Sequence, residues 1–114
     1  MIEVQSLSRY YGSRCAVDRV SFSISSRGVV GFLGLNGAGK TTTLKVLAGL
    51  ILPSGGDVAV DGVDMASSPT GVRARIGFLP EDPPLYTEMT VADSLRFVGG
   101  LRGMTDAAIA DRLP

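Results

Sequence analysis

The stretch Gly34-Leu35-Asn36-Gly37-Ala38-Gly39-Lys40-Thr41 decides the fold class of this chain. It matches the pattern G-x-x-x-x-G-K-[ST], in which glycines let backbone N–H groups curl around phosphate oxygens. The free N–H groups and the positive end of a following helix then face the same anion. The stretch predicts an α/β fold with a phosphate-binding loop (P-loop), in which Lys40 reaches the β- and γ-phosphates and the Thr41 hydroxyl binds Mg²⁺.

The flanking segments supply the context that this motif requires. Residues 29–33 (VVGFL) form a continuous apolar run, which is typical of a strand buried on both faces. After the motif, apolar residues recur on one face of a helix that Pro53 should end. The GTPase motifs D-x-x-G and N-K-x-D do not occur in the sequence. The Lys40-Thr41 pair also argues against a dinucleotide site, because it is a nucleoside-triphosphate signature.

Shorter elements are predicted further out. Strands are expected at residues 2–7, 20–24, 58–60 and 76–79, and turns at 9–14, 26–28 and Asp61-Gly62. Residues 90–93 (TVAD) fit a capping box that opens a helix, and Thr105 fits the cap of another.

Composition excludes several classes of protein. Hydrophobic residues make up 45% and charged residues 19% of the 114-residue chain, which rules out disorder. The net charge is zero, +4 in residues 1–50 and −4 in residues 51–114, so no nucleic-acid partner is expected. No signal peptide or membrane-spanning run is visible. Cys15 is the single cysteine, which favours a cytosolic location. Histidine is absent, which excludes catalysis by histidine and metal ligation by histidine.

Together with Thr42, the P-loop resembles the Walker A loop of ABC-transporter ATPases. Segments on both sides of the P-loop resemble segments of the same family and occur in the same order. Their residues are most similar to those of ABC-2-type exporter ATPases. These segments are Tyr10-Tyr11-Gly12, residues 52–58 (LPSGGDV), residues 76–81 (IGFLPE) and residues 89–91 (MTV). The resemblance implies an ABC-type P-loop core with an antiparallel β subdomain. It divides the chain into an adenine-side β region (1–27), the P-loop strand and helix (28–53), strands leading to the Q-loop (54–82), and the start of a helical subdomain (83–114).

The resemblance also implies a binding site for ATP and Mg²⁺. Tyr11 would stack on adenine, with Tyr10 as the alternative, and Val17 would either flank the base or pack in the core. The triphosphate would be held by Asn36, Gly37, Ala38, Gly39, Lys40, Thr41 and Thr42. Thr41 and Glu81 would contact the metal, and Lys40 and Glu81 would contribute to catalysis.

Glu81 departs from the family pattern, which usually has Gln at this position. An ionised Glu can contact Mg²⁺, but it cannot donate a hydrogen bond to orient a water molecule. The alternative interpretation is a solvated loop acid beside Asp82.

The implied function is the ATP-binding part of a transporter ATPase subunit at the cytoplasmic face of the membrane. Such subunits form head-to-tail dimers and drive transmembrane permease subunits. The family's signature motif, Walker B acids and switch histidine do not occur in residues 1–114. We therefore expect the amino-terminal portion of a longer subunit, which binds Mg-ATP without sustained turnover. The alternatives are a soluble ABC-type ATPase of repair or translation, and a truncated non-hydrolysing nucleotide-binding module.

Overall fold

A computed structural model describes residues 1–25 and 27–114 as two compact units. The first unit is Met1–Phe78 and the second is Leu79–Pro114, and each is described by itself. The boundary between the two units lies inside the region predicted at 54–82. The predicted division of the chain into four regions stays a prediction. None of the helices in the described residues is long and apolar enough to cross a bilayer.

The first unit is built on a four-stranded antiparallel sheet. Its strands are β1 (Ile2–Tyr11), β2 (Arg14–Ile24), β3 (Gly55–Val60) and β4 (Val63–Asp64), in the spatial order β2-β1-β3-β4. β1 therefore lies between its sequence neighbour β2 and the distant strand β3. The turn predicted at 9–14 is shorter than expected, because β1 continues to Tyr11 and β2 begins at Arg14. Gly12 turns the chain with φ 61°. The turn predicted at 26–28 includes Ser26, which lies outside the described residues.

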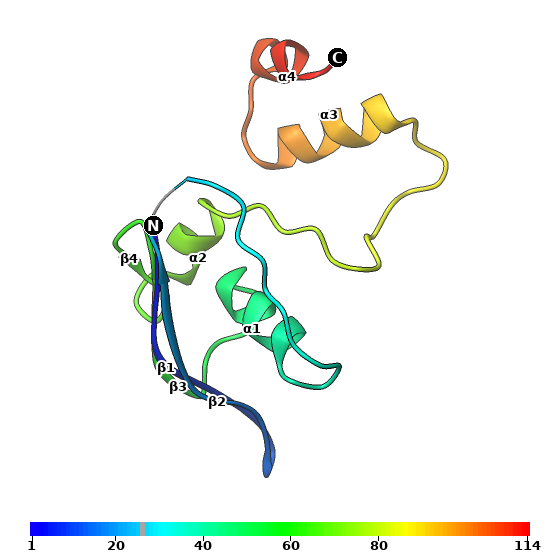
Figure 1. Cartoon of the computed structure of the whole chain (residues 1–114). Coiled ribbons are helices and arrows are strands. Elements are labelled where there is room, and N and C mark those ends of the chain that lie inside the picture. Colours follow the sequence, from blue (N-terminus) through cyan, green and yellow to red (C-terminus); the bar gives the residue numbers. More distant parts are fainter. Residues whose placement is uncertain (26) are drawn as a thin grey trace. The chain divides into compact units, whose positions relative to one another are not determined.

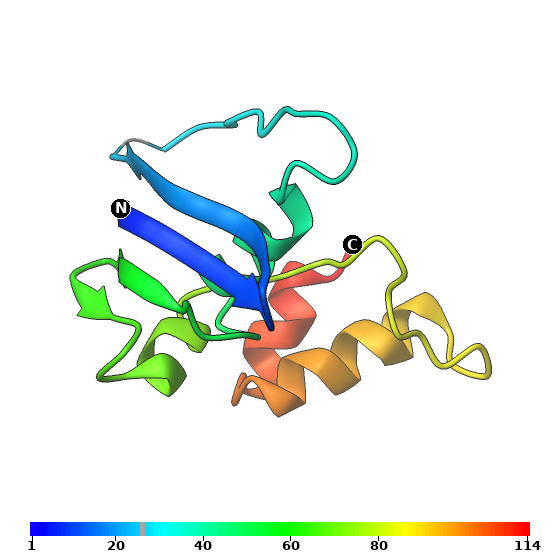
Figure 2. The ribbon, with the colours of Figure 1, turned by 90° about the horizontal axis from the view of Figure 1, so that it is seen from below.

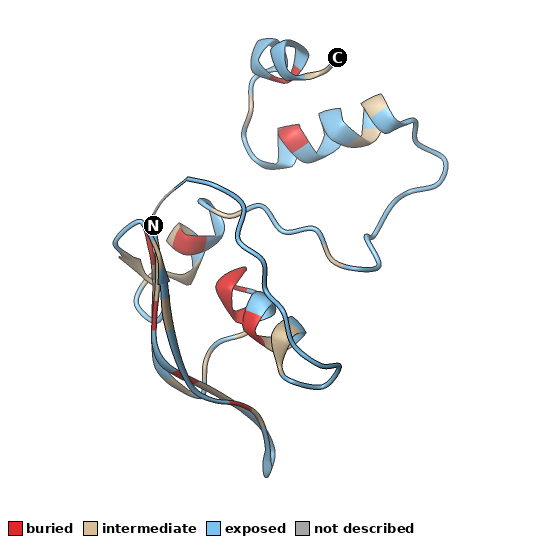
Figure 3. Ribbon diagram, in the orientation of Figure 1, coloured by how far each residue is buried: buried red, intermediate tan, exposed pale blue. Residues whose placement is uncertain are grey.

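Two helices, α1 (Lys40–Leu47) and α2 (Pro69–Arg73), supply the other side of the core. Their buried side chains pack with those of the sheet, and Figure 3 shows the buried positions gathering on α1, α2 and the strands. The core consists of Val4, Leu7, Val17, Val46, Leu47, Val58, Val60, Met65 and Val72. Val58 and Val60 alternate along β3, as expected of a strand with one buried face. The buried residues of β1, Val4 and Leu7, are three apart, because a register shift interrupts the alternation between them.

The helix after the P-loop ends earlier than predicted. Gly49 adopts φ 71° and its N–H donates to the Val46 carbonyl, while the Leu50 N–H donates to the Lys45 carbonyl. These two bonds form a Schellman motif, which satisfies the last carbonyls of the helix and stops it. Gly49 rather than Pro53 therefore ends α1.

The strands predicted at 29–33 and 76–79 are absent from the described residues. Residues 29–35 run outside the sheet, and Val29 and Leu33 are 102% and 94% exposed. A strand buried on both faces forms only between neighbouring strands, and none of the four described strands pairs with this run. Phe32 contacts Phe22 of β2, with ring centroids 6.0 Å apart, which fixes one point of the run against the sheet.

The second unit contains α3 (Val91–Leu101) and α4 (Asp106–Arg112), which lie side by side (Figure 2). Both predicted caps are confirmed, since the Thr90 and Thr105 hydroxyls accept from the Asp93 and Ala108 N–H groups. The helices meet where Gly99 faces the buried Ile109. Before α3, the Tyr86 ring packs edge-to-face on Phe97 at 6.0 Å.

Candidate nucleotide-binding site

The P-loop enters α1 through two glycines in left-handed conformations. Gly37 has φ 84° and Gly39 has φ 90°, which only glycine adopts easily. The Ala38 N–H donates to the Leu35 carbonyl at 3.1 Å and closes a turn inside the loop. A Cβ at Gly39 would lie 2.4 Å from the Ala16 carbonyl oxygen. Gly39 therefore lets the start of α1 approach β2 more closely than any other residue could.

The amino-terminal end of α1 is open toward the loop. Its N-cap residue is Gly39, and this end has no side-chain cap in the described part of the chain. The first N–H groups of a helix have no acceptor inside the helix, so those of Lys40, Thr41 and Thr42 are available to a ligand. No acidic residue occupies the first turn. This end of α1 thus combines free donors with the positive pole of the helix, which suits an anion.

Lys40 folds back over the loop. Its Nζ donates to the carbonyl oxygens of Gly34 and, at 3.1 Å, of Leu35. Backbone carbonyls are the acceptors within its reach when no anion is bound, and the side chain is half-buried. The ammonium therefore already lies within the loop that would surround a phosphate.

The remaining loop residues predicted to hold phosphate face solvent. Asn36, Gly37, Ala38 and Thr41 are exposed, and Thr42 is partly buried. No cluster of three metal-ligating side chains occurs among the described residues. Mg²⁺ usually keeps water and takes one or two protein ligands plus phosphate oxygens. The Thr41 hydroxyl beside the loop fits that donor set.

The two candidate tyrosines differ in their contacts. Both residues are 44% exposed, so exposure does not separate them. A hydrogen bond with the Thr42 hydroxyl, aided by Arg9 and Lys45, lowers the pKa of the Tyr11 phenol. Tyr10 interacts instead with Cys15 across the β1–β2 ladder, chiefly by a hydrogen bond that raises the pKa of Tyr10. Tyr11 is thus the tyrosine that contacts the P-loop helix.

Val17 and Glu81 are placed differently from the loop residues. Val17 is 4% exposed and belongs to the hydrophobic core, as one of the two alternatives predicted. Glu81 belongs to the second unit, where it and Asp82 are exposed in the segment before α3. The roles of both residues toward a nucleotide stay predictions.

Arg9 lies beside this site and was not among the predicted residues. Its Cζ lies 4.9 Å from the centroid of the Tyr11 ring, and its Nη1 donates to the Leu52 carbonyl at 2.9 Å. Strand periodicity could have indicated Arg9 from the sequence. Residues i and i+2 of a strand lie on the same face, and Arg9 and Tyr11 are two residues apart in β1.

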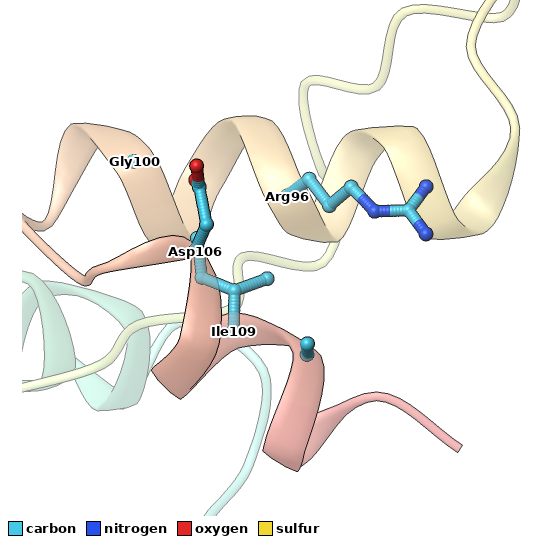
Figure 4. A pocket seen from close by; sticks show the side chains of 5 residues that line it. Arg96, Gly100, Asp106 and Ile109 are labelled. Atoms are coloured by element: carbon cyan, nitrogen blue, oxygen red, sulfur yellow. The ribbon is translucent and has the colours of Figure 1, made fainter.

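A hollow of about 470 Å³ lies against α3 and α4 in the second unit. Figure 4 shows that the Arg96 and Asp106 side chains point away from each other. Arg96 pairs with Asp93 at 3.2 Å on its own helix. This hollow therefore has no converging polar groups and does not resemble a ligand site.

Comparisons with known proteins agree with this geometry. The ABC transporter family model matches residues 17–113. The chain is 34% identical over 113 residues to the probable multidrug ABC transporter ATP-binding protein YbhF of Escherichia coli, covering 99% of this chain and 20% of YbhF. It is 35% identical over 114 residues to the Nod factor export ATP-binding protein I of Ralstonia nicotianae, covering 100% of this chain and 36% of that protein.

Among solved structures, an ATP-binding subunit of an ABC transporter superposes with a TM-score of 0.86 at 35% identity. The match covers 99% of this chain and 47% of that one, and the chain spans less than half the length of each relative named. Its fold is that of an ABC-type ATP-binding cassette, with the antiparallel β subdomain as predicted. From the P-loop geometry and these matches, the chain belongs to the ABC transporter family.

Proposed function

We propose that this chain is the ATP-binding part of an ABC transporter ATPase subunit that couples ATP binding and hydrolysis to export across a membrane. The observation that carries the proposal is the P-loop, whose Lys40 folds into the loop at the uncapped start of α1. The relatives named above are ATP-binding proteins of multidrug and Nod factor transport. Their names favour transport over repair, translation or a non-hydrolysing module.

In this proposal the phosphates take the place that backbone carbonyls now hold around Lys40. The Lys40 ammonium moves from the Gly34 and Leu35 oxygens to the β- and γ-phosphates, a charge-assisted contact that is stronger than its present ones. Residues 36–42 supply N–H groups to the phosphate chain, with Thr42 toward the α-phosphate. The Tyr11 ring stacks on adenine, and the Thr42 hydroxyl lowers the pKa of its phenol.

Mg²⁺ would be held by the Thr41 hydroxyl, with Glu81 as a further contact. When bound, it neutralises negative charge on the phosphates. The exposed position of Thr41 leaves its hydroxyl accessible to such an ion.

The proposed partners are a second ATPase subunit and transmembrane permease subunits, with the chain at the cytoplasmic face of the membrane. The second subunit would close the nucleotide site head to tail. Nucleic acid is not among the proposed partners, because the chain carries no net charge.

Titration of the purified protein with ATP in Mg²⁺ tests the nucleotide-binding proposal. Lys40→Ala should weaken binding roughly 10- to 150-fold, the range for a lost charge-assisted hydrogen bond. Arg75→Ala is the matched control, because Arg75 is an exposed cation of the same unit whose guanidinium donates to the Gly71 carbonyl. Its removal should change affinity about twofold at most, as expected for an exposed charge. Equal effects of the two substitutions, or no ATP binding at all, would overturn the proposal.

A further inference from the structure

Resting on the proposed function, we propose that Arg9 is a positioning residue for the base, because it holds the Tyr11 ring with one face open. The Arg9 guanidinium lies over one face of the ring, with its Cζ 4.9 Å from the centroid. A flat ring has two faces, so a base that stacks on Tyr11 must use the other one. Arg9 therefore fixes which side of Tyr11 receives the base.

The Arg9 side chain is itself held in place. Its Nη1 donates to the Leu52 carbonyl at 2.9 Å, which joins the end of β1 to the segment after α1. Its Nε is buried and has no hydrogen-bond partner in the part of the chain that the structure describes. The guanidinium is thus enclosed between the ring and the backbone rather than free in solvent.

Backbone contacts strengthen the same junction. The Ser54 N–H donates to the Ser8 carbonyl at 2.8 Å, and the Tyr10 N–H donates to the Ser54 hydroxyl at 3.0 Å. The end of β1 is therefore fastened to residues 52–54 on both sides of Arg9. Because only residues 48–51 separate residues 52–54 from the P-loop helix, this junction ties the position of the Tyr11 ring to that helix.

A fixed ring binds a base more tightly than a mobile one. An exposed tyrosine loses rotamer freedom when a ligand stacks on it, and that loss weakens binding. Arg9 on one face of the ring restricts it before the nucleotide arrives. Arg9 thus favours nucleotides through their base, whereas Lys40 and the loop recognise phosphate.

Binding of ATP and of inorganic tripolyphosphate, measured by calorimetry with Mg²⁺, separates these two parts. Arg9→Gln should weaken ATP binding roughly three- to tenfold, because both the cation–π contact and the ordering of the ring are lost. It should leave tripolyphosphate binding unchanged. Tyr11→Ala should weaken ATP binding roughly 5- to 150-fold, the range for loss of a stacked base. Arg14→Gln is the matched control, since Arg14 is the exposed cross-strand neighbour of Tyr11.

The double variant Arg9→Gln/Tyr11→Ala provides the decisive comparison. If Arg9 acts through the ring, the double variant binds ATP as weakly as Tyr11→Ala alone. Additive losses, an equal loss of tripolyphosphate binding, or the same loss in Arg14→Gln would overturn the inference. If Arg9→Gln binds neither ligand, Arg9→Lys decides: it should keep tripolyphosphate binding and lose less ATP affinity than Tyr11→Ala, and a greater loss counts against the inference.

The proposed function fails in a different way. It fails if wild-type protein binds neither ATP nor tripolyphosphate, or if Lys40→Ala leaves both unchanged. If Lys40 matters while Arg9→Gln has no effect on ATP, the proposed function stands and the role of Arg9 is refuted.

Discussion

Replacing Gly39 by alanine should cost this protein more stability than the same change at any other P-loop glycine. Gly39 has φ 90°, beyond the left-handed region that other residues reach with difficulty. That conformation costs an L-residue about 1–2 kcal/mol. The new Cβ would also lie 2.4 Å from the Ala16 carbonyl oxygen and 3.1 Å from Val17 Cγ2.

The contact with Ala16 is with backbone, so it cannot be relieved by a side-chain rotation. β2 and the start of α1 must move apart, and overpacking of this kind costs about 1–3 kcal/mol. The two effects together give about 2–5 kcal/mol. With a urea dependence of about 2 kcal/mol per molar, the midpoint of unfolding should fall by roughly 1–2.5 M.

Two other glycines provide matched controls for urea unfolding followed by circular dichroism. Gly37 has φ 84° but nothing within 4 Å of an added Cβ, so Gly37→Ala should show only the conformational cost. Gly31 has open space and an ordinary φ, so Gly31→Ala should leave the midpoint unchanged or raise it slightly. If Gly39→Ala costs no more than Gly37→Ala, the close approach of α1 to β2 is not the reason for this glycine.

Three further predictions concern the second unit and turnover. The Thr90 hydroxyl donates to Asp93 at 2.7 Å and, with Arg96, lowers the pKa of Asp93. The stabilisation from ionised Asp93 is therefore present above the ordinary aspartate range, about 4, and is lost as pH falls through the lowered pKa. Unfolding midpoints at pH 7 and pH 3 should differ less in Asp93→Asn than in wild type, and an equal difference would contradict this reading. Adjacent glycines of α3 should respond oppositely: Gly99→Ala brings a Cβ 2.9 Å from Ile109 and destabilises, whereas Gly100→Ala has open space and stabilises by about 0.5–1 kcal/mol. Thermal unfolding measures both, and a loss of stability at Gly100 would be the contrary result. Finally, a protein consisting of residues 1–114 should bind Mg-ATP without steady-state phosphate release; release that depends on Lys40 and Mg²⁺ would refute this.

The sequence determined the features that depend on residues close together in the chain. The P-loop needs glycines at fixed spacing before Lys40, and the motif predicted both the loop and the helix that follows it. The caps at Thr90 and Thr105 are equally local, because a side chain bonds a backbone group three residues on. The alternation of apolar residues likewise predicted the first part of β1 and the last part of β2, although the end of β1 and the start of β2 were predicted as a turn.

Tertiary structure decided the features that need a distant neighbour. The apolar run at 29–33 was predicted as a buried strand, but strand formation requires hydrogen-bonding partners that the run itself does not contain. Two tyrosines in succession are equivalent in sequence, and pairing of β1 with β2 decides that Tyr10 meets Cys15. Packing of α1 against β2 brings Tyr11 to Thr42. Arg9 contacts Leu52, 43 residues away, which no local pattern encodes. Backbone hydrogen-bond geometry is short-ranged and can be predicted from neighbouring residues, whereas a contact across the fold exists only once the intervening chain has packed.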